Sequence, residues 1–318
     1  MIARFPIFGR RFSEAWRLVT RLARCGRPTR DGYSPGPMTV TVVAASHVGK
    51  VRPHNEDSFL IESLGSAPGH VSRPASQHCM PATGALLLVA DGMGGPAAGE
   101  VASAMATAVV SARLTEVWRH HDRPTRERVS QCLSEAMAAA NGEIHSYASR
   151  DPQLTGMGTT ATVVVLLEDQ LCVGHVGDSR AYLVRAGRAQ QLTADHSWIQ
   201  HLLDTGTLSP EEAARSPQRH ILLRALGPQP EVAVDVSEHP LRDGDVLVLC
   251  SDGLWSTVAE DEIVAVLSSE PNLGVVCDTL IDLANMRGGL DNITVLAARV
   301  GAGGRDSTTE DADRRSSE

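Results

Sequence analysis

The sequence predicts an α+β fold in which antiparallel strands and paired helices pack in layers. Two observations carry this prediction: the strand patterns come in consecutive groups, and the helical patterns come in pairs. Strands that alternated one by one with helices would instead predict a parallel sheet. The chain has 318 residues, of which 42% are hydrophobic, which is enough for one large domain or two ordinary ones.

The first half of the body has three predicted strands and two long predicted helices. The strands are Thr39–Ala45, Ser58–Glu62 and Ala85–Ala90. Between the last two lies Gly65–Thr83, rich in Gly, Pro, Ser and His, which we expect to be a variable surface loop. Apolar residues at three-to-four spacing then predict helices over Ala98–His120 and Thr125–Ser149.

The second half begins with a predicted meander of consecutive antiparallel strands. These strands are Thr160–Leu167, Leu171–Val176, Ala181–Arg185 and Ala189–Leu192. The later strands are Val232–Val236, Val246–Cys250 and Ile293–Val300. The helices are Ser197–Thr205, Pro210–Arg215, Asp261–Ser268 and Leu273–Asn285. No repeat or linker divides residues 38–300, so we expect a single domain there.

Charge is distributed unevenly along the chain. Residues 1–37 carry eight arginines against Glu14 and Asp31, which gives this segment a charge of +6. Because the whole chain has a net charge of −9, residues 38–318 carry a charge of −15. Such an acidic body suits divalent cations and is a poor match for nucleic acid, which basic side chains bind.

Both ends of the sequence are expected to lie outside the folded domain. Residues 1–37 are predicted to be a basic extension, either disordered or an amphipathic helix, unless the protein begins at Met38. Peripheral membrane contact through residues 1–24 is a less favoured alternative, because Gly26 and Pro28 interrupt the segment. Residues 301–318 lack apolar periodicity and are predicted to be a disordered tail.

Neither a membrane span nor a disulfide framework is predicted. No apolar run approaches the roughly 18–20 residues that a transmembrane helix needs. The six cysteines include no Cys-x-x-Cys pair, and Cys172 and Cys250 lie inside apolar strand-like runs. We therefore expect reduced thiols and a cytoplasmic protein.

Acidic side chains stand where predicted strands begin or end. They are Glu56, Asp57, Asp91, Asp178, Asp252 and Asp291. Carboxylates gathered at one rim repel one another unless cations neutralise them, and oxygen ligands favour Mg²⁺ or Mn²⁺ over zinc. Gly92 would let a backbone carbonyl approach a metal, and Arg52 could clamp a phosphate dianion.

Each of these features also has an ordinary interpretation. Asp91-Gly92 and Asp252-Gly253 could be turns, and Asp178 could form a surface ion pair with Arg180. Arg52 could pair with Glu56. Composition and spacing alone therefore predict only an acidic metal site.

Eight short motifs follow one another across residues 40–300. They are Gly49–Arg52 with Asn55–Asp57, Val89–Gly95 with Gly99–Glu100, Gly158–Thr160, Val176–Tyr182, Leu192–Ser197, Arg224–Gly227, Cys250–Trp255 and Asp291–Val295. In this order they resemble the metal-dependent protein phosphatases, the PPM or type 2C family, in its bacterial form.

The resemblance implies a four-layer α-β-β-α sandwich of two antiparallel sheets flanked by helices. It also implies a cleft with two Mn²⁺ or Mg²⁺ ions and a weaker third ion. By this resemblance Asp91 would bridge the two ions, with Asp252 and Asp291 on one and the Gly92 carbonyl on the other. Asp178 would help to hold the third ion.

Further roles around the ions follow from the same resemblance. Glu56 and Asp57 would bind metal-coordinated waters, and Arg52 would grip the substrate phosphate. His196–Ser216, which begins with His196 and Ser197, would form a mobile flap beside the site.

One position departs from the animal enzymes that the motifs resemble. Those enzymes carry a histidine after Asp-Gly that is thought to protonate the leaving group, and Met93 stands there in this chain. His47, His54 and His196 are candidates for a general acid by sequence proximity alone. A metal-bound water is the alternative.

The leading hypothesis is a phosphoprotein phosphatase that hydrolyses phosphoserine and phosphothreonine by a metal-activated water. Its partners would be phosphorylated proteins, among them a Ser/Thr kinase that it opposes, and it would act as a monomer. A catalytically silent binding module is the first alternative, although such a module would be expected to lose the metal carboxylates. Another two-metal hydrolase, such as a nuclease, is disfavoured by the acidic body.

Overall fold

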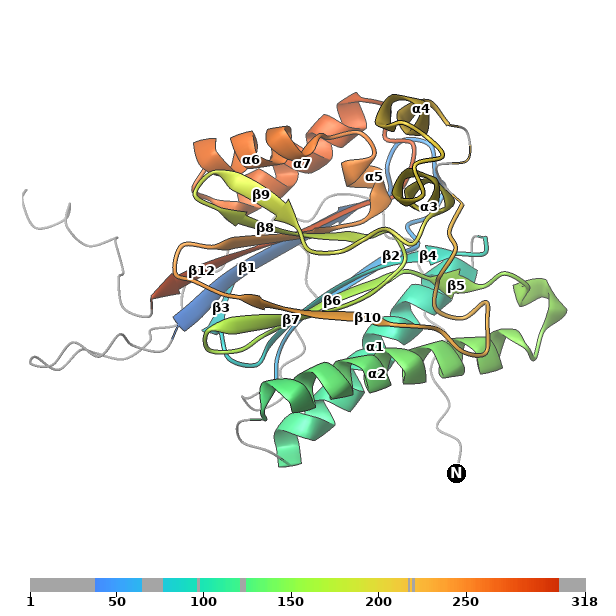
Figure 1. Cartoon of the computed structure of the whole chain (residues 1–318), viewed down its shortest axis with the longest axis horizontal. Coiled ribbons are helices and arrows are strands. Elements are labelled where there is room, and N and C mark those ends of the chain that lie inside the picture. Colours follow the sequence, from blue (N-terminus) through green and yellow to red (C-terminus); the bar gives the residue numbers. More distant parts are fainter. Residues whose placement is uncertain are drawn as a thin grey trace, which may run out of the picture.

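The computed structural model describes residues 38–64, 77–95, 98–120, 124–216, 218 and 221–302. Two antiparallel sheets pack face to face, and a pair of helices covers the outer side of each sheet (Figure 1). The predicted four-layer α-β-β-α arrangement is confirmed. The predicted extension at 1–37, nearly all of the tail at 301–318 and most of the loop at 65–83 lie outside the described residues.

The first sheet has the strand order β3-β1-β12-β11-β8-β9. Its strands are β1 (Met38–His47), β3 (His78–Pro81), β8 (Arg180–Arg185), β9 (Arg188–Gln191), β11 (Val246–Cys250) and β12 (Ile293–Ala302). Strands β1 and β12 pair along their whole length, from Met38 opposite Ala302 to His47 opposite Ile293. The outer face is covered by α6 (Glu260–Ser269) and α7 (Leu273–Met286).

The second sheet has the order β10-β7-β6-β4-β2, with β5 paired to the end of β4. Its strands are β2 (Asp57–Ser63), β4 (Ala85–Met93), β5 (Gly158–Thr159), β6 (Ala161–Leu166), β7 (Gln170–Val176) and β10 (Asp235–Pro240). The outer face is covered by α1 (Ala98–His120) and α2 (Arg126–Ala148). The hydroxyl of Thr125 caps α2 by accepting from the Arg128 N–H.

Three short helices gather at one end of the sandwich (Figure 1). They are α3 (Trp198–Asp204), α4 (Pro210–Arg215) and α5 (Asp252–Trp255). A 3₁₀ turn at Pro152–Leu154 follows α2. Among the described helices, none combines the length and the apolar character that crossing a membrane requires.

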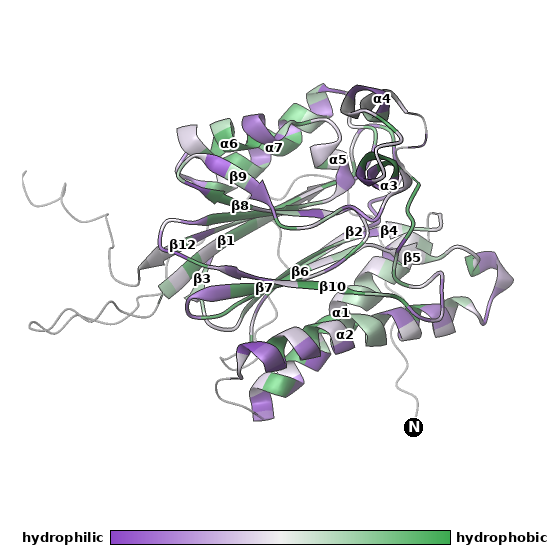
Figure 2. Cartoon of the chain, in the orientation of Figure 1, coloured by the Kyte–Doolittle hydropathy of each residue, from purple (hydrophilic) through white to green (hydrophobic). Residues whose placement is uncertain are grey.

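The core consists of three apolar layers, visible as the hydrophobic colour of the strands in Figure 2. Strand β4 shows how they form, because successive side chains on a strand point to opposite faces. Leu86 and Leu88 pack toward α1 and α2, whereas Leu87 and Val89 pack between the sheets. A third layer lies between the first sheet and the helices α6 and α7. Burial on both faces explains the continuous apolar runs of the sequence.

The predicted meander is wrong in one respect. Strands β6 and β7 form a hairpin in the second sheet, whereas β8 and β9 form a hairpin in the first. The edge of β7 that does not pair with β6 pairs with β10, so β8 cannot continue the same sheet. The chain instead crosses between the sheets at residues 177–179.

Five further elements differ from the prediction. Strand β3 lies within the predicted loop, and β5 was not predicted. The last strand of the second sheet spans Asp235–Pro240 rather than Val232–Val236. Asp91-Gly92 is no turn, because β4 continues to Met93 through pairing with β5. Asp252 begins the short helix α5.

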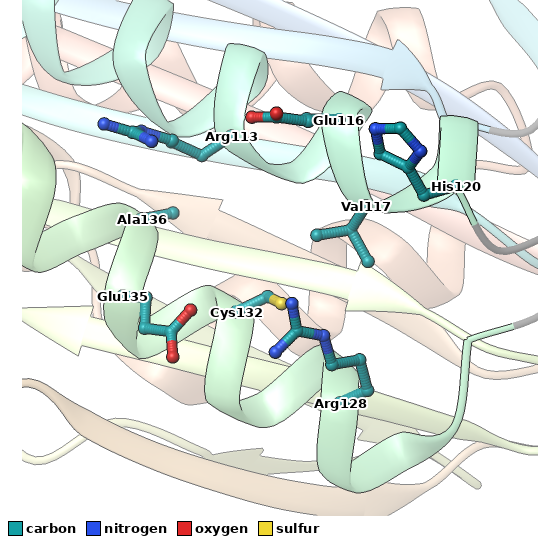
Figure 3. Close-up of a pocket in the computed structure, with 8 residues that line it drawn as sticks. All are labelled: Arg113, Glu116, Val117, His120, Arg128, Cys132, Glu135 and Ala136. Atoms are coloured by element: carbon teal, nitrogen blue, oxygen red, sulfur yellow. The ribbon is translucent and has the colours of Figure 1, made fainter.

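A groove of about 410 Å³ lies between the two helices of the second sheet (Figure 3). Its lining residues are Arg113, Glu116, Val117, His120, Arg128, Cys132, Glu135 and Ala136. None of them is a predicted site residue, so the predicted chemistry is not located in this groove.

Candidate active site

Predicted carboxylates from both sheets meet at the end of the sandwich where α5 begins. Asp57 opens β2 and lies directly opposite Asp91 of β4. Asp252 follows β11 and Asp291 precedes β12, which is the neighbouring strand. The ends of four paired strands thus place the acids on a rigid support.

Asp57 connects the two sheets. Its Oδ2 accepts hydrogen bonds from Ser251 Oγ at 2.7 Å and from Thr294 Oγ1 at 2.6 Å, both from the first sheet. Its Oδ1 is buried and has no hydrogen-bond partner. A buried carboxylate oxygen without a donor favours a site that a cation or its bound water completes.

The backbone of Asp91 is held by two threonines. Its N–H donates to Thr160 Oγ1 at 3.0 Å, and its carbonyl accepts from the Thr160 N–H and from Thr159 Oγ1, each at 2.8 Å. Thr160 Oγ1 also lies 2.7 Å from Ser179 Oγ. The Gly158–Thr160 motif therefore positions Asp91, a role that the sequence did not reveal.

Gly92 allows the start of α1 to pack against the site. A β carbon on Gly92 would lie 2.1 Å from the Gly99 carbonyl oxygen, and one on Gly99 would lie 2.1 Å from Glu56 Oε2. The Gly92 N–H also donates to the Glu56 carbonyl at 3.2 Å. Glycine is thus needed here for close packing that brings the Glu56 carboxylate to α1. A metal-binding role of the Gly92 carbonyl stays a prediction.

Asn292 organises the loop before β2, a role that the sequence does not predict. Its Oδ1 accepts from the Glu56 N–H at 2.7 Å, and its Nδ2 donates to the carbonyls of Val48 at 3.0 Å and His54 at 2.9 Å. The side chain is buried. No local pattern in the sequence indicates this role, because a buried amide takes its partners from wherever the fold supplies them.

Arg52 pairs with an acid other than the one considered from the sequence. Its Nη2 lies 2.6 Å from Asp291 Oδ2, and the two side chains are 53% and 28% exposed. This hydrogen bond raises the pKa of Arg52, and the positive charge of Arg52 partly offsets the effect of burial on the pKa of Glu56. The predicted phosphate clamp thus lies at the same edge as the predicted metal acids.

Asp178 does not form the surface ion pair with Arg180 considered above. Arg180 instead binds Asp195 through Nη2 at 2.7 Å and Nε at 2.9 Å, and its guanidinium lies 3.6 Å from the centre of the Trp255 ring. The Asp178 carbonyl accepts from Trp255 Nε1 at 2.8 Å, and its side chain is buried. Asp178 is therefore an inward-facing acid of the same cluster.

The carboxylates of this cluster destabilise one another's charged forms. Burial raises the pKa of Asp57 to about 7 and those of Asp91 and Asp178 well above the usual range, and repulsion among the acids raises them further. Divalent cations would relieve this repulsion, so the residues fit a metal site. In the described ranges, no three His, Cys, Asp or Glu side chains lie close enough to hold an ion as they stand. A bound ion would therefore draw these carboxylates closer together than they lie here.

The three candidate histidines occupy different environments. His47 Nδ1 accepts from the Gly49 N–H at 2.9 Å, whereas His54 is exposed beside Glu56. His196 is buried, with Nδ1 accepting from the Gly177 N–H at 3.1 Å and Nε2 3.0 Å from Asp235 Oδ2. Both nitrogens of His196 are engaged in structural contacts, which disfavours it as a general acid.

His196 and Ser197 anchor the start of the predicted flap. The His196 N–H donates to the Gly177 carbonyl at 2.7 Å, and the Ser197 hydroxyl caps α3 by accepting from the Gln200 N–H. Asp235 Oδ1 also accepts from Arg224 Nη1 at 2.6 Å, so Asp235 links Arg224 to His196 at the start of the flap. Movement of the remaining flap residues stays a prediction.

Comparison with known proteins agrees with this fold. A family model described as Protein phosphatase 2C matches residues 69–280. The serine/threonine phosphatase stp of Listeria monocytogenes is 39% identical over 250 residues, which cover 78% of this chain and 91% of that protein. PstP of Mycobacterium tuberculosis is 37% identical over 263 residues, which cover 83% of this chain and 45% of that protein.

Solved structures show the same relationship. The crystal structure of the M. tuberculosis serine/threonine phosphatase PstP/Ppp matches with a TM-score of 0.69 and 36% identity over 82% of this chain and 98% of that one. The catalytic domain of PstP in complex with two manganese ions matches with a TM-score of 0.67 and 35% identity, over 83% and 99% of the two chains. The chain belongs to the protein phosphatase 2C family.

Proposed function

We propose that the chain is a metal-dependent protein phosphatase that hydrolyses phosphoserine and phosphothreonine. The observation that carries this proposal is the convergence of Asp57, Asp91, Asp252 and Asp291 from two sheets onto one edge, beside Arg52. The relatives described as serine/threonine phosphatases support the substrate class. A silent binding module is disfavoured because all the acids of the predicted site are present.

The acids would hold two Mn²⁺ or Mg²⁺ ions. The PstP catalytic domain, a relative of this chain, has been solved in complex with two manganese ions. When bound, two divalent cations lower the pKa of water and neutralise charge on the transferred phosphoryl group. Asp91 would be shared, Asp252 and Asp291 would contribute oxygens on the first-sheet side, and Asp178 would serve a weaker third ion. Glu56 and Asp57 would accept hydrogen bonds from bound waters.

Arg52 would orient the phosphoryl group through its guanidinium. In the reaction water adds to phosphorus, the bond from phosphorus to the seryl or threonyl oxygen breaks, and that oxygen takes a proton. The products are inorganic phosphate and the free hydroxyl group.

The cellular setting is also proposed. The substrates would include a Ser/Thr kinase, and the protein would act as a cytoplasmic monomer, with contact to membranes through residues 1–24 as an alternative. The buried thiols of Cys132, Cys172, Cys250 and Cys277 are in keeping with a reducing compartment. The catalytic domain would span residues 38–300, which contain the family match.

The test is hydrolysis of a phosphothreonine peptide and of an aryl phosphate by the purified protein, with Mn²⁺ and with chelator. Asp91→Asn and Asp252→Asn should lower metal-dependent turnover more than about a hundredfold while retaining the circular dichroism spectrum. Arg52→Ala should chiefly raise KM. Asp169→Asn, at an exposed surface ion pair, is the matched control. Turnover that resists chelation, or near-normal rates in Asp91→Asn, would overturn the proposal.

A further inference from the structure

The most exposed large apolar side chains of the described residues lie on the loop after β1, at the end of α7 and on the loop before β12. They are Met286 at 71%, Val51 at 62% and Leu290 at 54% exposure. Exposed apolar groups that gather in one place mark a binding surface more often than scattered ones do.

The chain places two of these residues directly beside the predicted catalytic pair. Val51 precedes Arg52, and Leu290 precedes Asp291, and the side chains of Arg52 and Asp291 meet at 2.6 Å. A polypeptide that brings a phosphate to Arg52 would therefore pass close to the loops that carry Val51 and Leu290.

The two loops are interlocked, so the apolar residues are held in fixed positions. The Lys50 N–H donates to the Gly289 carbonyl at 2.7 Å. A β carbon on Gly49, which has a φ of 80°, would lie 2.2 Å from the Asp291 carbonyl oxygen. Glycine is required at this contact, and the close approach joins the loop after β1 to the loop before β12.

The end of α7 presents Met286 and Leu290. The Gly288 N–H donates to the Asn285 carbonyl and the Gly289 N–H to the Ala284 carbonyl, each at 3.1 Å. This pair of bonds is a Schellman motif, which ends a helix and reverses the chain. Reversal exposes Met286 at the helix end and leads Leu290 back to the site.

We propose that Val51, Met286 and Leu290, the rim patch, bind an apolar side chain of the substrate close to its phosphorylated residue. This rests on the proposed phosphatase function and adds sequence selectivity to it. A substrate is the favoured occupant because the patch is continuous with the Arg52–Asp291 pair. The first and last described residues, Met38 and Ala302, lie together at the end of β1 and β12 that is about 30 Å from His47. The chain segments that adjoin them therefore start far from the patch, which favours a substrate over these segments as the occupant.

The test is a panel of phosphothreonine peptides in which one leucine is moved through the three positions on either side of the phosphothreonine. Leucine at one or two positions should raise kcat/KM over an all-serine peptide. Changing Val51, Met286 and Leu290 together to serine should remove this preference by raising KM about fivefold to tenfold, the effect of losing one partly buried apolar contact. Hydrolysis of the aryl phosphate should not change.

The matched control is Val275→Ser. Val275 is also exposed but lies eleven residues earlier on α7, about 16 Å along the helix. The affinities of non-hydrolysable phosphonate peptides, measured by fluorescence anisotropy, should rank the peptides of the panel in the same order as kcat/KM does. This binding measurement tests the patch even if turnover fails.

Several results would overturn the proposal. They are equal rates and affinities across the panel, an equal loss in Val275→Ser, or a wild-type dimer that the triple change dissociates. A leucine preference that appears only after residues 1–37 are deleted would likewise assign the patch to that segment. Loss of all metal-dependent turnover in the wild type would instead contradict the proposed function.

Discussion

Arg52 Nη2 lies 2.6 Å from Asp291 Oδ2, so the predicted phosphate clamp is paired with a predicted metal ligand. Each group would need a different partner in the working enzyme, phosphate for Arg52 and a cation for Asp291. Binding of a cation by Asp291 would therefore free Arg52 for the substrate. If Asp291 binds a metal and Arg52 binds phosphate, this ion pair would couple the two events.

Asp291→Asn should raise the affinity of the metal-free protein for inorganic phosphate. The change removes the negative charge that holds Arg52, and because the pair is partly exposed the gain should be about threefold. Calorimetry in the presence of chelator measures this affinity. Asp169→Asn, which removes an acid from the surface pair with Arg126, should have no effect. A weaker or unchanged phosphate affinity in Asp291→Asn would contradict the coupling.

Asp91→Asn should make the metal-free protein more stable at pH 7.5. The pKa of Asp91 is raised well above its usual range by burial and by neighbouring acids, so its charged form costs folding energy at this pH. The gain should be about 1–3 kcal/mol, scaled down from the shift because the cluster can relax. Thermal unfolding with chelator tests this. Adding Mn²⁺ should stabilise the wild type more than the variant, and a variant that is less stable in chelator would refute the charge argument.

Asn292→Ala should lower the free energy of unfolding by about 2–4 kcal/mol, because it removes three hydrogen bonds from a buried side chain to the backbone of Glu56, Val48 and His54. Urea unfolding in chelator measures the loss apart from metal binding. Asn272→Ala, which removes only the exposed cap of α7, should cost about 1 kcal/mol. Equal losses in the two variants would show that Asn292 does not organise this loop.

The stability of the protein should depend on pH through His175. Burial and the neighbouring His196 lower the pKa of His175 to about 3, whereas the unfolded chain has the ordinary value near 6.5. The unfolded state therefore binds the extra proton, so stability is complete above pH 6.5 and falls as pH decreases toward 3. Between pH 7.5 and 5, wild type should lose about 2 kcal/mol more than His175→Gln in urea unfolding. Parallel losses in both proteins would contradict this assignment.

Much of the fold could be predicted from local patterns. Apolar periodicity identified α1, α2 and most strands, and the ordered motifs predicted the four layers. The assignment of strands to sheets could not be predicted locally, because β10, which is distant in sequence, occupies the edge of β7 that a meander would have used. The continuation of β4 through Asp91 likewise depends on pairing with β5.

For the site, the sequence predicted the acids and Arg52 but not the groups that hold them. Asn292 bonds to Glu56 across 236 residues, and Thr294 bonds to Asp57 across 237. Such contacts have no local signature, since ordinary polar residues make them wherever the fold brings them together. The same holds for the pairing of Arg52 with Asp291 rather than with nearby Glu56.

The most direct test of the central claim is the anomalous scattering of manganese in crystals grown with Mn²⁺. We predict two manganese peaks at the end of the sandwich where α5 begins, with Asp91 as their shared ligand and Asp252 and Asp291 in contact with one of them. Both peaks should be lost or weakened in Asp91→Asn. Manganese bound elsewhere, or peaks that do not contact Asp91, would contradict the account.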